Sequence, residues 1–316
     1  MNTFCTIISH DYYSFAINLF HSLEKFNAGI KFQILVTEKD IPEAIRQKMP
    51  EGITIYYIKD LENSELFSLV QKKYEYINDS FRWSLKPIFI STLLKRYDKV
   101  IYVDCDIHFF NDPSFLFEEL NNTSILLSPH WGETNPLDDE ENFLLNFRIG
   151  LYNAGFIGAT AKGINALMWW ANACSYSIEN NESRGLYVDQ RYLDLIPIID
   201  SNAKILRHKG CNLGSWNINT CKRSIKNEKV LINDEFPVIF IHFNYETIRH
   251  ILNGNDTLLK PCFTEYEKLF NQQGQTLNDL IGKLAEWKKT SFLLSMKRKT
   301  KIRSRIKRWL YKLSTK

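Results

Sequence analysis

The feature that most constrains the fold is an alternation of strand-like and helix-like segments near the N-terminus. Residues 3–9, 31–37 and 53–58 are short apolar runs rich in β-branched side chains, which is typical of buried strands. A stripe of apolar residues at helical spacing over 15–26 separates the first two, and a shorter helical segment, 42–49, precedes the third. This alternation predicts a doubly wound, mostly parallel sheet with helices on its faces.

A pair of carboxylates follows another strand of the same kind. Residues 100–103 (Val-Ile-Tyr-Val) lead directly into Asp104 and Asp106. Residues two apart on an extended chain point to the same side, and two converging carboxylates repel each other unless a cation or a proton lies between them. Because ligands bind at the carboxyl ends of parallel strands, we expect a hard divalent metal here. The alternative is a strand-end turn with solvated carboxylates.

The cysteine pattern and the distribution of apolar residues indicate in which cellular compartment the protein is expected. The six cysteines contain no Cys-x-x-Cys pair, which indicates free thiols in a reducing environment and argues against a zinc knuckle. The N-terminus lacks the pattern of a signal peptide, and the chain has no uninterrupted apolar run of about 18 residues. We therefore expect a cytoplasmic protein without a membrane-spanning helix.

The C-terminal end differs in charge from the rest. Residues 288–316 carry 12 Lys or Arg and no acid, which leaves 28 basic and 36 acidic residues elsewhere, a net charge of −8. Apolar residues fall at helical spacing among these bases: Ile302, Ile306, Trp309, Leu310 and Leu313. This pattern predicts a basic amphipathic helix on an anionic membrane surface, so we expect a peripheral protein on the inner face of the cell membrane. A disordered basic end is the alternative. Nucleic acid is not an expected partner, since no base-reading motif accompanies the tail.

Four segments resemble nucleotide-sugar-dependent glycosyltransferases of the GT-A fold: 83–89, 97–106, 153–158 and 188–193. In order and spacing they are similar to the small bacterial enzymes that build lipopolysaccharide or capsule, including retaining galactosyltransferase-like ones. The resemblance covers roughly residues 3–250. It implies a Rossmann-like nucleotide-diphospho-sugar transferase with a mixed, mostly parallel sheet.

The same resemblance sets the expected domains and activity. A GT-A catalytic domain is expected over residues 1–255, with a helical extension over 256–316. The implied enzyme is a metal-dependent glycosyltransferase that moves a sugar from a nucleoside-diphosphate sugar, such as a UDP-sugar, to a lipid-linked or envelope glycan.

The resemblance also implies a ligand set. A metal bridging both phosphates would stabilise the charge that develops on the leaving group. Asp106 is then a direct ligand, and Asp104 contacts the metal through water or contacts the ribose or sugar of the donor. His242, a lone imidazole at the end of the predicted strand 236–243, is the expected third ligand; a hydrogen-bonded histidine at the rim of the core is the alternative. This mixed set suits Mn²⁺, with Mg²⁺ as the competitor.

The nucleotide is expected after the first strand. Ser9, Asp11 and Tyr12 follow that strand, where the switch-point rule and the family both place the base, and Thr6 and Ile7 are expected to line the same pocket. A plain turn with Asp11 as a helix cap is the alternative.

The diphosphate and the sugar are expected nearby. Arg82 and Lys86 lie beside a helix start, although a solvated helix lysine is the alternative for Lys86. Asn153, Ala154 and Gly155 fit a strand edge where the donor sugar approaches the backbone, and a packing glycine is the alternative.

Asp189 and Gln190 are the expected catalytic residues, because they resemble the acidic–amide pair beneath the anomeric carbon in retaining relatives. Either residue would stabilise an oxocarbenium-like transition state or act as a nucleophile. In an inverting enzyme Asp189 would instead deprotonate the acceptor hydroxyl. A helix-capping aspartate is the alternative.

The acceptor is expected near two aromatic residues. Trp216, among the small polar residues of 210–217, is a candidate platform for a sugar ring, or it closes the core. His130 begins a loop, 130–141, that is expected to lie over the site. His108 is expected to be structural.

The chain departs from the retaining galactosyl type late in the sequence. Those relatives carry His-x-x-Gly-x-x-Lys-Pro-Trp, whereas this chain has Phe-Ile-His-Phe-Asn-Tyr at 240–245. The missing lysine removes one diphosphate contact and leaves the stereochemistry open. Two other hypotheses are a haloacid-dehalogenase-type phosphohydrolase, whose Gly-Thr turn is absent after Asp106, and a catalytically silent sugar-nucleotide-binding protein.

Overall fold

The computed structural model describes residues 1–282 except 39, 48, 62–63, 275, 277–278 and 280. The chain divides into two compact units, Met1–Leu269 and Phe270–Lys316. The predicted basic amphipathic helix within 288–316 lies outside the described residues. Among the helices of the described part, none is long and apolar enough to cross a membrane.

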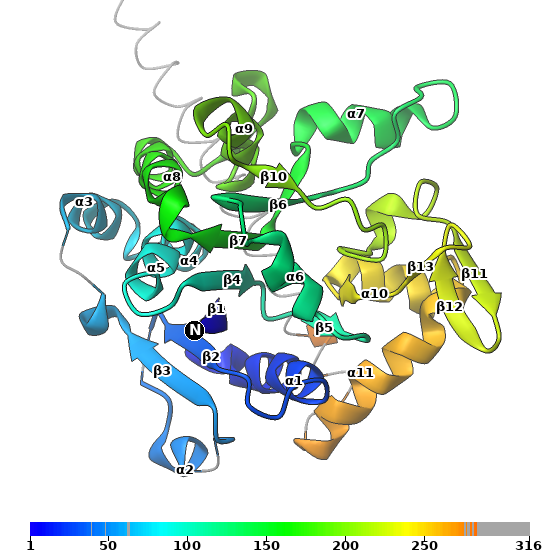
Figure 1. Cartoon of the computed structure of the whole chain (residues 1–316), viewed down its shortest axis with the longest axis horizontal. Coiled ribbons are helices and arrows are strands. Elements are labelled where there is room, and N and C mark those ends of the chain that lie inside the picture. The colour runs from blue at the N-terminus through cyan, green and yellow to red at the C-terminus, as the bar shows by residue number, and fades with distance from the viewer. Residues whose placement is uncertain are drawn as a thin grey trace, which may run out of the picture. The chain divides into compact units, whose positions relative to one another are not determined.

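A seven-stranded sheet forms the centre of the first unit, in the order β10-β6-β7-β4-β1-β2-β3 (Figure 1). Its strands are β1 (Asn2–Ile8), β2 (Phe32–Val36), β3 (Ile53–Tyr57), β4 (Lys99–Val103), β6 (Ile125–Pro129), β7 (Tyr152–Thr160) and β10 (Lys204–Ile205). β7 runs antiparallel to its neighbours β4 and β6, and every other pair in the sheet is parallel. The predicted mixed, mostly parallel sheet flanked by helices is therefore confirmed.

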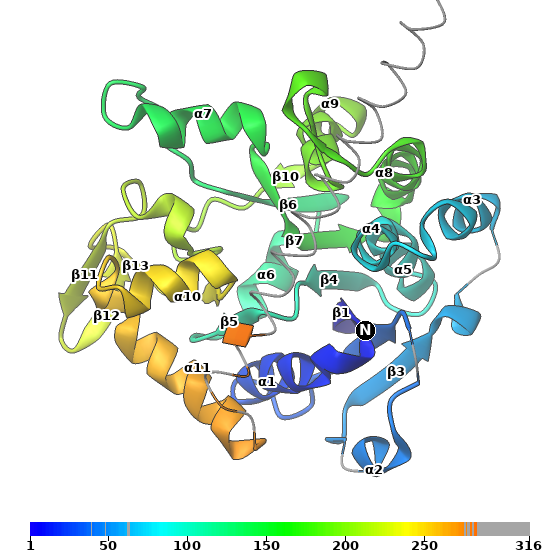
Figure 2. The same cartoon turned by 180° about the vertical axis from the view of Figure 1, so that it is seen from behind.

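Helices cover both faces of this sheet (Figures 1 and 2). One face packs against α3 (Glu65–Tyr74), α4 (Asn78–Ser84), α5 (Lys86–Leu93) and α8 (Ile164–Tyr176), and the other packs against α1 (Tyr13–Glu24) and α6 (Ser114–Glu119). In β4, Val100 and Tyr102 point into the first core while Ile101 and Val103 point into the second. Strands buried on both faces explain the continuous apolar runs in the sequence.

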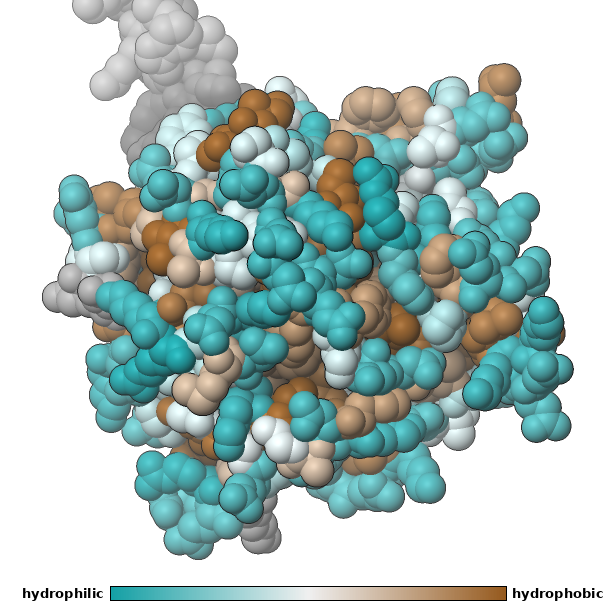
Figure 3. Space-filling view, viewed as in Figure 1, coloured by the Kyte–Doolittle hydropathy of each residue, from teal (hydrophilic) through white to brown (hydrophobic). Residues whose placement is uncertain are grey.

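Most of the remaining elements are short. The helices are α2 (Glu43–Arg46), α7 (Glu140–Arg148), α9 (Ile196–Ile199), α10 (Tyr245–Leu252) and α11 (Lys260–Gln272). The small strands are β5 (Ile107–Phe109), β8 (Asn180–Asn181), β9 (Leu186–Tyr187), β11 (Arg223–Lys226), β12 (Lys229–Ile232), β13 (Phe236–Pro237) and β14 (Phe240–His242). The visible surface is mostly hydrophilic with scattered apolar side chains (Figure 3).

The prediction of one continuous strand over 236–243 was wrong. The segment is divided between β13, which pairs with β12, and β14, which pairs antiparallel with β5 so that His242 lies opposite Ile107. β14 is fully buried, whereas Phe236 is half-buried and Pro237 is exposed in β13, and the apolar pattern alone does not show the break. The pairing of β14 with β5 brings the late histidine to the carboxylates that follow β4.

The helix predicted over 83–96 is also divided. α4 ends at Ser84 and α5 begins at Lys86, with Pro87 in the first turn of α5. Proline lacks a backbone N–H and is tolerated at a helix start but not in its interior, which accounts for a new helix at this point. The division directs the Lys86 side chain from a helix N-terminus toward the sheet.

Candidate active site

Three potential ligands converge where β4 ends. Asp104 and Asp106 lie in the connection between β4 and β5, and His242 ends β14. One carboxylate oxygen of each aspartate and one ring nitrogen of His242 all lie within 4.8 Å of one another. Among the described residues, these three form the only group of three or more acidic, histidine or cysteine side chains whose geometry could hold a metal ion.

Hydrogen bonds orient each of these ligands. His242 Nε2 lies 2.9 Å from Asp106 Oδ1, and its Nδ1 lies 3.4 Å from the side-chain nitrogen of Asn153. The Tyr102 hydroxyl donates to Asp104 Oδ1 over 2.6 Å. Such partners fix ring orientation and carboxylate geometry around a metal. A cation bound by His242 and Asp106 would displace the proton that these two side chains share.

The space between the ligands exists because residue 155 is glycine. A Cβ atom at Gly155 would lie 2.8 Å from His242 Cε1, 2.8 Å from Asn153 Oδ1 and 2.9 Å from Asp104 Oδ2. Any side chain would therefore enter the cradle formed by these groups. Two carboxylates and an imidazole form a donor set that suits a divalent transition metal, so the residues present fit such an ion.

Lys86 connects this cluster to Asp189. Its side chain is 3% exposed, and Nζ lies 3.3 Å from Asp104 Oδ1 and 3.3 Å from Asp189 Oδ2. Nζ also donates to the carbonyl of Ala154 over 3.1 Å. Burial opposes the charge, but the two carboxylates prevail and hold the pKa of Lys86 above its usual value. The alternative of a solvated helix lysine is thus excluded.

The two carboxylates bound by Lys86 differ in their protonation equilibria. Burial raises the pKa of Asp189, and the attraction of Lys86 offsets this only in part. Burial also acts on Asp104, but Lys86, His242 and the Tyr102 hydroxyl prevail and hold the pKa of Asp104 below its usual value. Asp104 is therefore suited to remain ionised beside a cation, whereas Asp189 depends on Lys86 for its charge.

Both polar atoms of the Gln190 side-chain amide form hydrogen bonds with the backbone. The Ala154 N–H donates to Oε1 over 3.1 Å, and Nε2 donates to the Ile149 carbonyl over 2.9 Å. Trp170 Nε1 donates to the Asp189 carbonyl over 2.9 Å, which fixes the neighbouring backbone. Of the predicted catalytic pair, Asp189 therefore presents its side chain to Lys86, and Gln190 ties the segment to β7.

The residues predicted for the nucleotide base, together with Arg82, which was predicted for the diphosphate or the sugar, fall into two groups. Arg82 pairs with Asp79 over 2.9 Å and lies 5.8 Å from the centre of the Tyr12 ring, so these side chains form one cluster. Thr6 and Ile7 are buried within β1, at 0% and 2% exposure. Ser9 follows them and is also buried.

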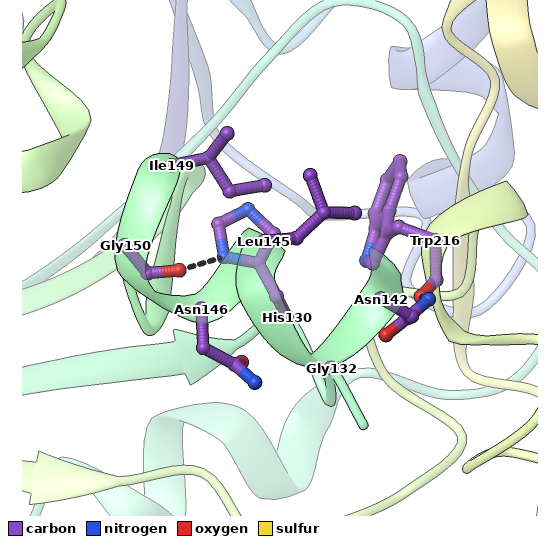
Figure 4. A pocket seen from close by; sticks show the side chains of 8 residues that line it. All are labelled: His130, Gly132, Asn142, Leu145, Asn146, Ile149, Gly150 and Trp216. Carbon is purple, nitrogen blue, oxygen red and sulfur yellow. Dashed lines mark hydrogen bonds between the residues drawn. The ribbon is translucent and has the colours of Figure 1, made fainter. Parts of the chain in front are cut away.

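The two residues predicted for the acceptor contact each other. His130 and Trp216 meet edge to face with ring centres 6.0 Å apart, and Trp216 meets His242 in the same manner at 5.7 Å. The His130 ring lies 3.0 Å from the Gly150 carbonyl through Nδ1, and burial lowers the pKa of His130 to about 4. His130 and Trp216 border a small pocket whose other lining includes Leu145 and Ile149 (Figure 4).

A row of three buried asparagines lies behind these residues, and only Asn153 among them was predicted for the site. Asn153 donates to Asn212 Oδ1 over 3.1 Å, and Asn217 donates to the Asn212 carbonyl over 2.8 Å. All three are 5% exposed or less. Buried amides must be hydrogen-bonded, so this row specifies the geometry between His242 and the Trp216 turn. The abundance of asparagine over 212–219 was the available signal.

His108 agrees with its predicted structural role. It is 1% exposed, and its ring packs against Phe110 and Tyr266 with centres 4.8 and 5.4 Å apart. Burial lowers the pKa of His108 to about 3, so the ring is neutral.

The N-terminal half of the chain matches a known family model, and the chain is similar to two curated proteins. Residues 4–155 match the family model of glycosyl transferase family 8. The chain is similar to the uncharacterized proteins YfnF and YfnD of Bacillus subtilis strain 168. YfnF is 29% identical over 248 residues, covering 77% of this chain and 81% of YfnF. YfnD is 28% identical over 255 residues, covering 78% of each chain.

Solved structures are similar at lower identity. One is the galactosyltransferase LgtC in complex with donor and acceptor sugar analogues, at 16% identity and a TM-score of 0.49, covering 77% of this chain and 87% of that one. Another is mouse xyloside xylosyltransferase 1, at 12% identity and a TM-score of 0.48, covering 78% and 99%.

Proposed function

Because residues 4–155 match glycosyl transferase family 8, we propose that the chain is a glycosyltransferase with a GT-A fold that transfers a sugar from a UDP-sugar to a lipid-linked or envelope glycan. A phosphohydrolase of the haloacid dehalogenase type does not fit this family. The observation that carries the proposal is the convergence of Asp104, Asp106 and His242 within 4.8 Å, connected through Lys86 to Asp189.

Asp106 and His242 would hold Mn²⁺, and Asp104 would contact the ion or orient the donor. The imidazole favours Mn²⁺ over Mg²⁺, which prefers an all-oxygen shell. When bound, the ion would stabilise the charge that develops on the diphosphate without moving a proton. The Gly155 cradle leaves the room that this requires.

The nucleotide would lie against Tyr12 and Arg82, beyond the end of β1, with Thr6, Ile7 and Ser9 lining that side. Asn153, Ala154 and Gly155 would form the strand edge along which the donor sugar lies, and the Trp216–His130 pair would form the acceptor side. A rigid edge of this kind positions the anomeric carbon relative to the attacking hydroxyl.

Asp189 would stabilise positive charge at the anomeric carbon, with retention of configuration. One Lys86 ammonium bridges Asp104 and Asp189, so Asp189 lies close to the residues that would hold the metal and the diphosphate. An inverting enzyme would instead use Asp189 to deprotonate the acceptor hydroxyl. The anomeric configuration of the product, measured by proton NMR, tests this: an inverted product would exclude the role.

The metal assignment is tested with UDP and Mn²⁺. We expect the pair to raise the melting temperature of the wild type, and a panel of UDP-sugars to include one that is slowly hydrolysed. Asp106→Ala should abolish both effects, whereas Asp40→Ala, at an exposed position, should leave them intact. Stabilisation that survives Asp106→Ala would refute the site. Stabilisation without any turnover would favour the silent sugar-nucleotide-binding protein.

The C-terminal segment would place the enzyme at its acceptor. Each basic residue near an anionic surface contributes roughly 1 kcal/mol, and residues 288–316 carry 12 of them. Full-length protein should co-sediment with phosphatidylglycerol vesicles and a chain ending at 287 should not. Equal binding by the two chains would refute membrane association through this segment.

A further inference from the structure

Arg223, in β11, makes four hydrogen bonds to the turn that carries Trp216. Nη1 donates to the carbonyls of Asn217 and Cys221 over 2.9 and 2.5 Å. Nη2 donates to the Gly214 carbonyl over 3.0 Å and to Asn217 Oδ1 over 3.3 Å. The planar guanidinium presents several donors in a fixed geometry, so one side chain can define the path of the whole turn 214–221.

Asp256 holds this guanidinium from its remaining side. Its Oδ2 lies 3.1 Å from Arg223 Nε, and the two side chains are 5% and 3% exposed. Burial lowers the pKa of Arg223 and raises the pKa of Asp256, against their mutual attraction. A buried ion pair adds little net stability once its desolvation is counted. The four bonds to a single turn therefore point to positioning rather than to stabilisation of the fold.

Within this turn, Trp216 contacts His242 of the candidate site. A Cβ atom at Gly214 would lie 2.3 Å from the Trp216 ring, so the ring lies against the backbone of its own turn. The same ring meets His242 at 87°, with centres 5.7 Å apart. Asn217 adds a second connection, because it donates to the His130 carbonyl over 3.1 Å.

We propose that Arg223, held by Asp256, is a positioning residue that fixes the turn 214–221 so that Trp216 stays against His242. The pair thus shapes one wall of the site from behind without contacting the donor. That this wall is the acceptor side rests on the proposed function.

Fluorine NMR of full-length protein labelled with 5-fluorotryptophan tests this placement. The chain has seven tryptophans, and Trp216→Phe identifies the Trp216 signal. Arg223→Lys keeps the charge but replaces the planar fork by a single ammonium. We expect the Trp216 signal to shift or split while the other signals stay in place, and the affinity for UDP with Mn²⁺ to change less than twofold. Arg46→Lys, which alters an exposed arginine in α2, should change no signal.

Asp256→Asn provides the second variant, because it keeps the shape of the partner and removes its charge. It should reproduce the change confined to Trp216. An unchanged Trp216 signal in both variants would overturn the proposal. So would changes spread over all the tryptophans in both variants, since those indicate a general structural role. If the wild type fails to bind UDP with Mn²⁺, the proposed function fails, while the response of the Trp216 signal still decides the placement.

Discussion

Replacing Lys86 with methionine should leave the Asp189 carboxylate without its cation. Methionine fills a similar volume, so the change removes charge rather than packing. The Asp189 side chain is 2% exposed, and Lys86 Nζ lies 3.3 Å from it. Removing one partner of a buried pair typically costs about 3–5 kcal/mol, because the other charge stays buried and uncompensated.

Protonation of Asp189 limits this cost. Keeping a carboxyl neutral costs about 1.4 kcal/mol for each pH unit above its unfolded pKa of about 3.9, so the loss should reach about 4 kcal/mol at pH 7 and about 1.5 kcal/mol at pH 5. The sign follows from the raised pKa of Asp189 in the folded variant. The variant is least impaired below the unfolded pKa, and its deficit grows as the pH rises toward the folded pKa.

Urea unfolding of wild type and Lys86→Met at pH 5 and pH 7 measures the deficit. The double variant Lys86→Met/Asp189→Asn should recover most of the stability at pH 7, since Asp104 is 29% exposed and keeps its bond from Tyr102. A deficit independent of pH, or a double variant less stable than Lys86→Met, would show that the ammonium does not compensate Asp189.

Three further changes probe other contacts. Gly155→Ala places a Cβ 2.8 Å from His242 Cε1 and should weaken binding of UDP with Mn²⁺ at least tenfold by calorimetry, while Gly29→Ala, whose Cβ would meet its nearest atom at 3.6 Å, should not. Tyr102→Phe deletes the 2.6 Å bond to a charged acceptor and should cost about 1.5–3 kcal/mol in urea unfolding; no loss would mean that water replaces the hydroxyl. His130, whose pKa burial lowers to about 4, stabilises the fold above pH 6.5 and loses this effect as the pH falls toward 4. Between pH 7.5 and pH 5 the wild type should therefore lose about 2 kcal/mol more than His130→Gln, and equal losses would contradict the burial of a neutral ring.

The sequence predicts those parts of the fold that local pattern determines. The strands of the sheet are continuous apolar runs because both of their faces are buried. The change from apolar residues to aspartates after Val103 marks the edge of the sheet where Asp104 and Asp106 lie. His242 was found through the family resemblance and not through periodicity. Its strand is interrupted in a way that apolar pattern does not reveal.

The features that the sequence did not predict are contacts between residues far apart in the chain. The bridge from Lys86 to Asp189 joins residues from different elements, and Lys86 has the same local pattern as an exposed helix lysine. The hydrogen bonds of the asparagine row, and those from Arg223 to the turn 214–221, likewise form only when these segments are brought together and buried. Polar residues in loops give few local clues because their hydrogen-bond partners come from elsewhere in the chain.

The pairing of β5 with β14 has a consequence for folding of the chain during its translation. Phe109 pairs with Phe240, so the strand that follows the carboxylates has no partner until the ribosome has made most of the chain. Contacts of such large sequence separation form late, because the entropy of closing the loop must be overcome first. A nascent or truncated chain would therefore have the aspartates but not the imidazole. The proposed metal site would be complete only once β14 has paired with β5.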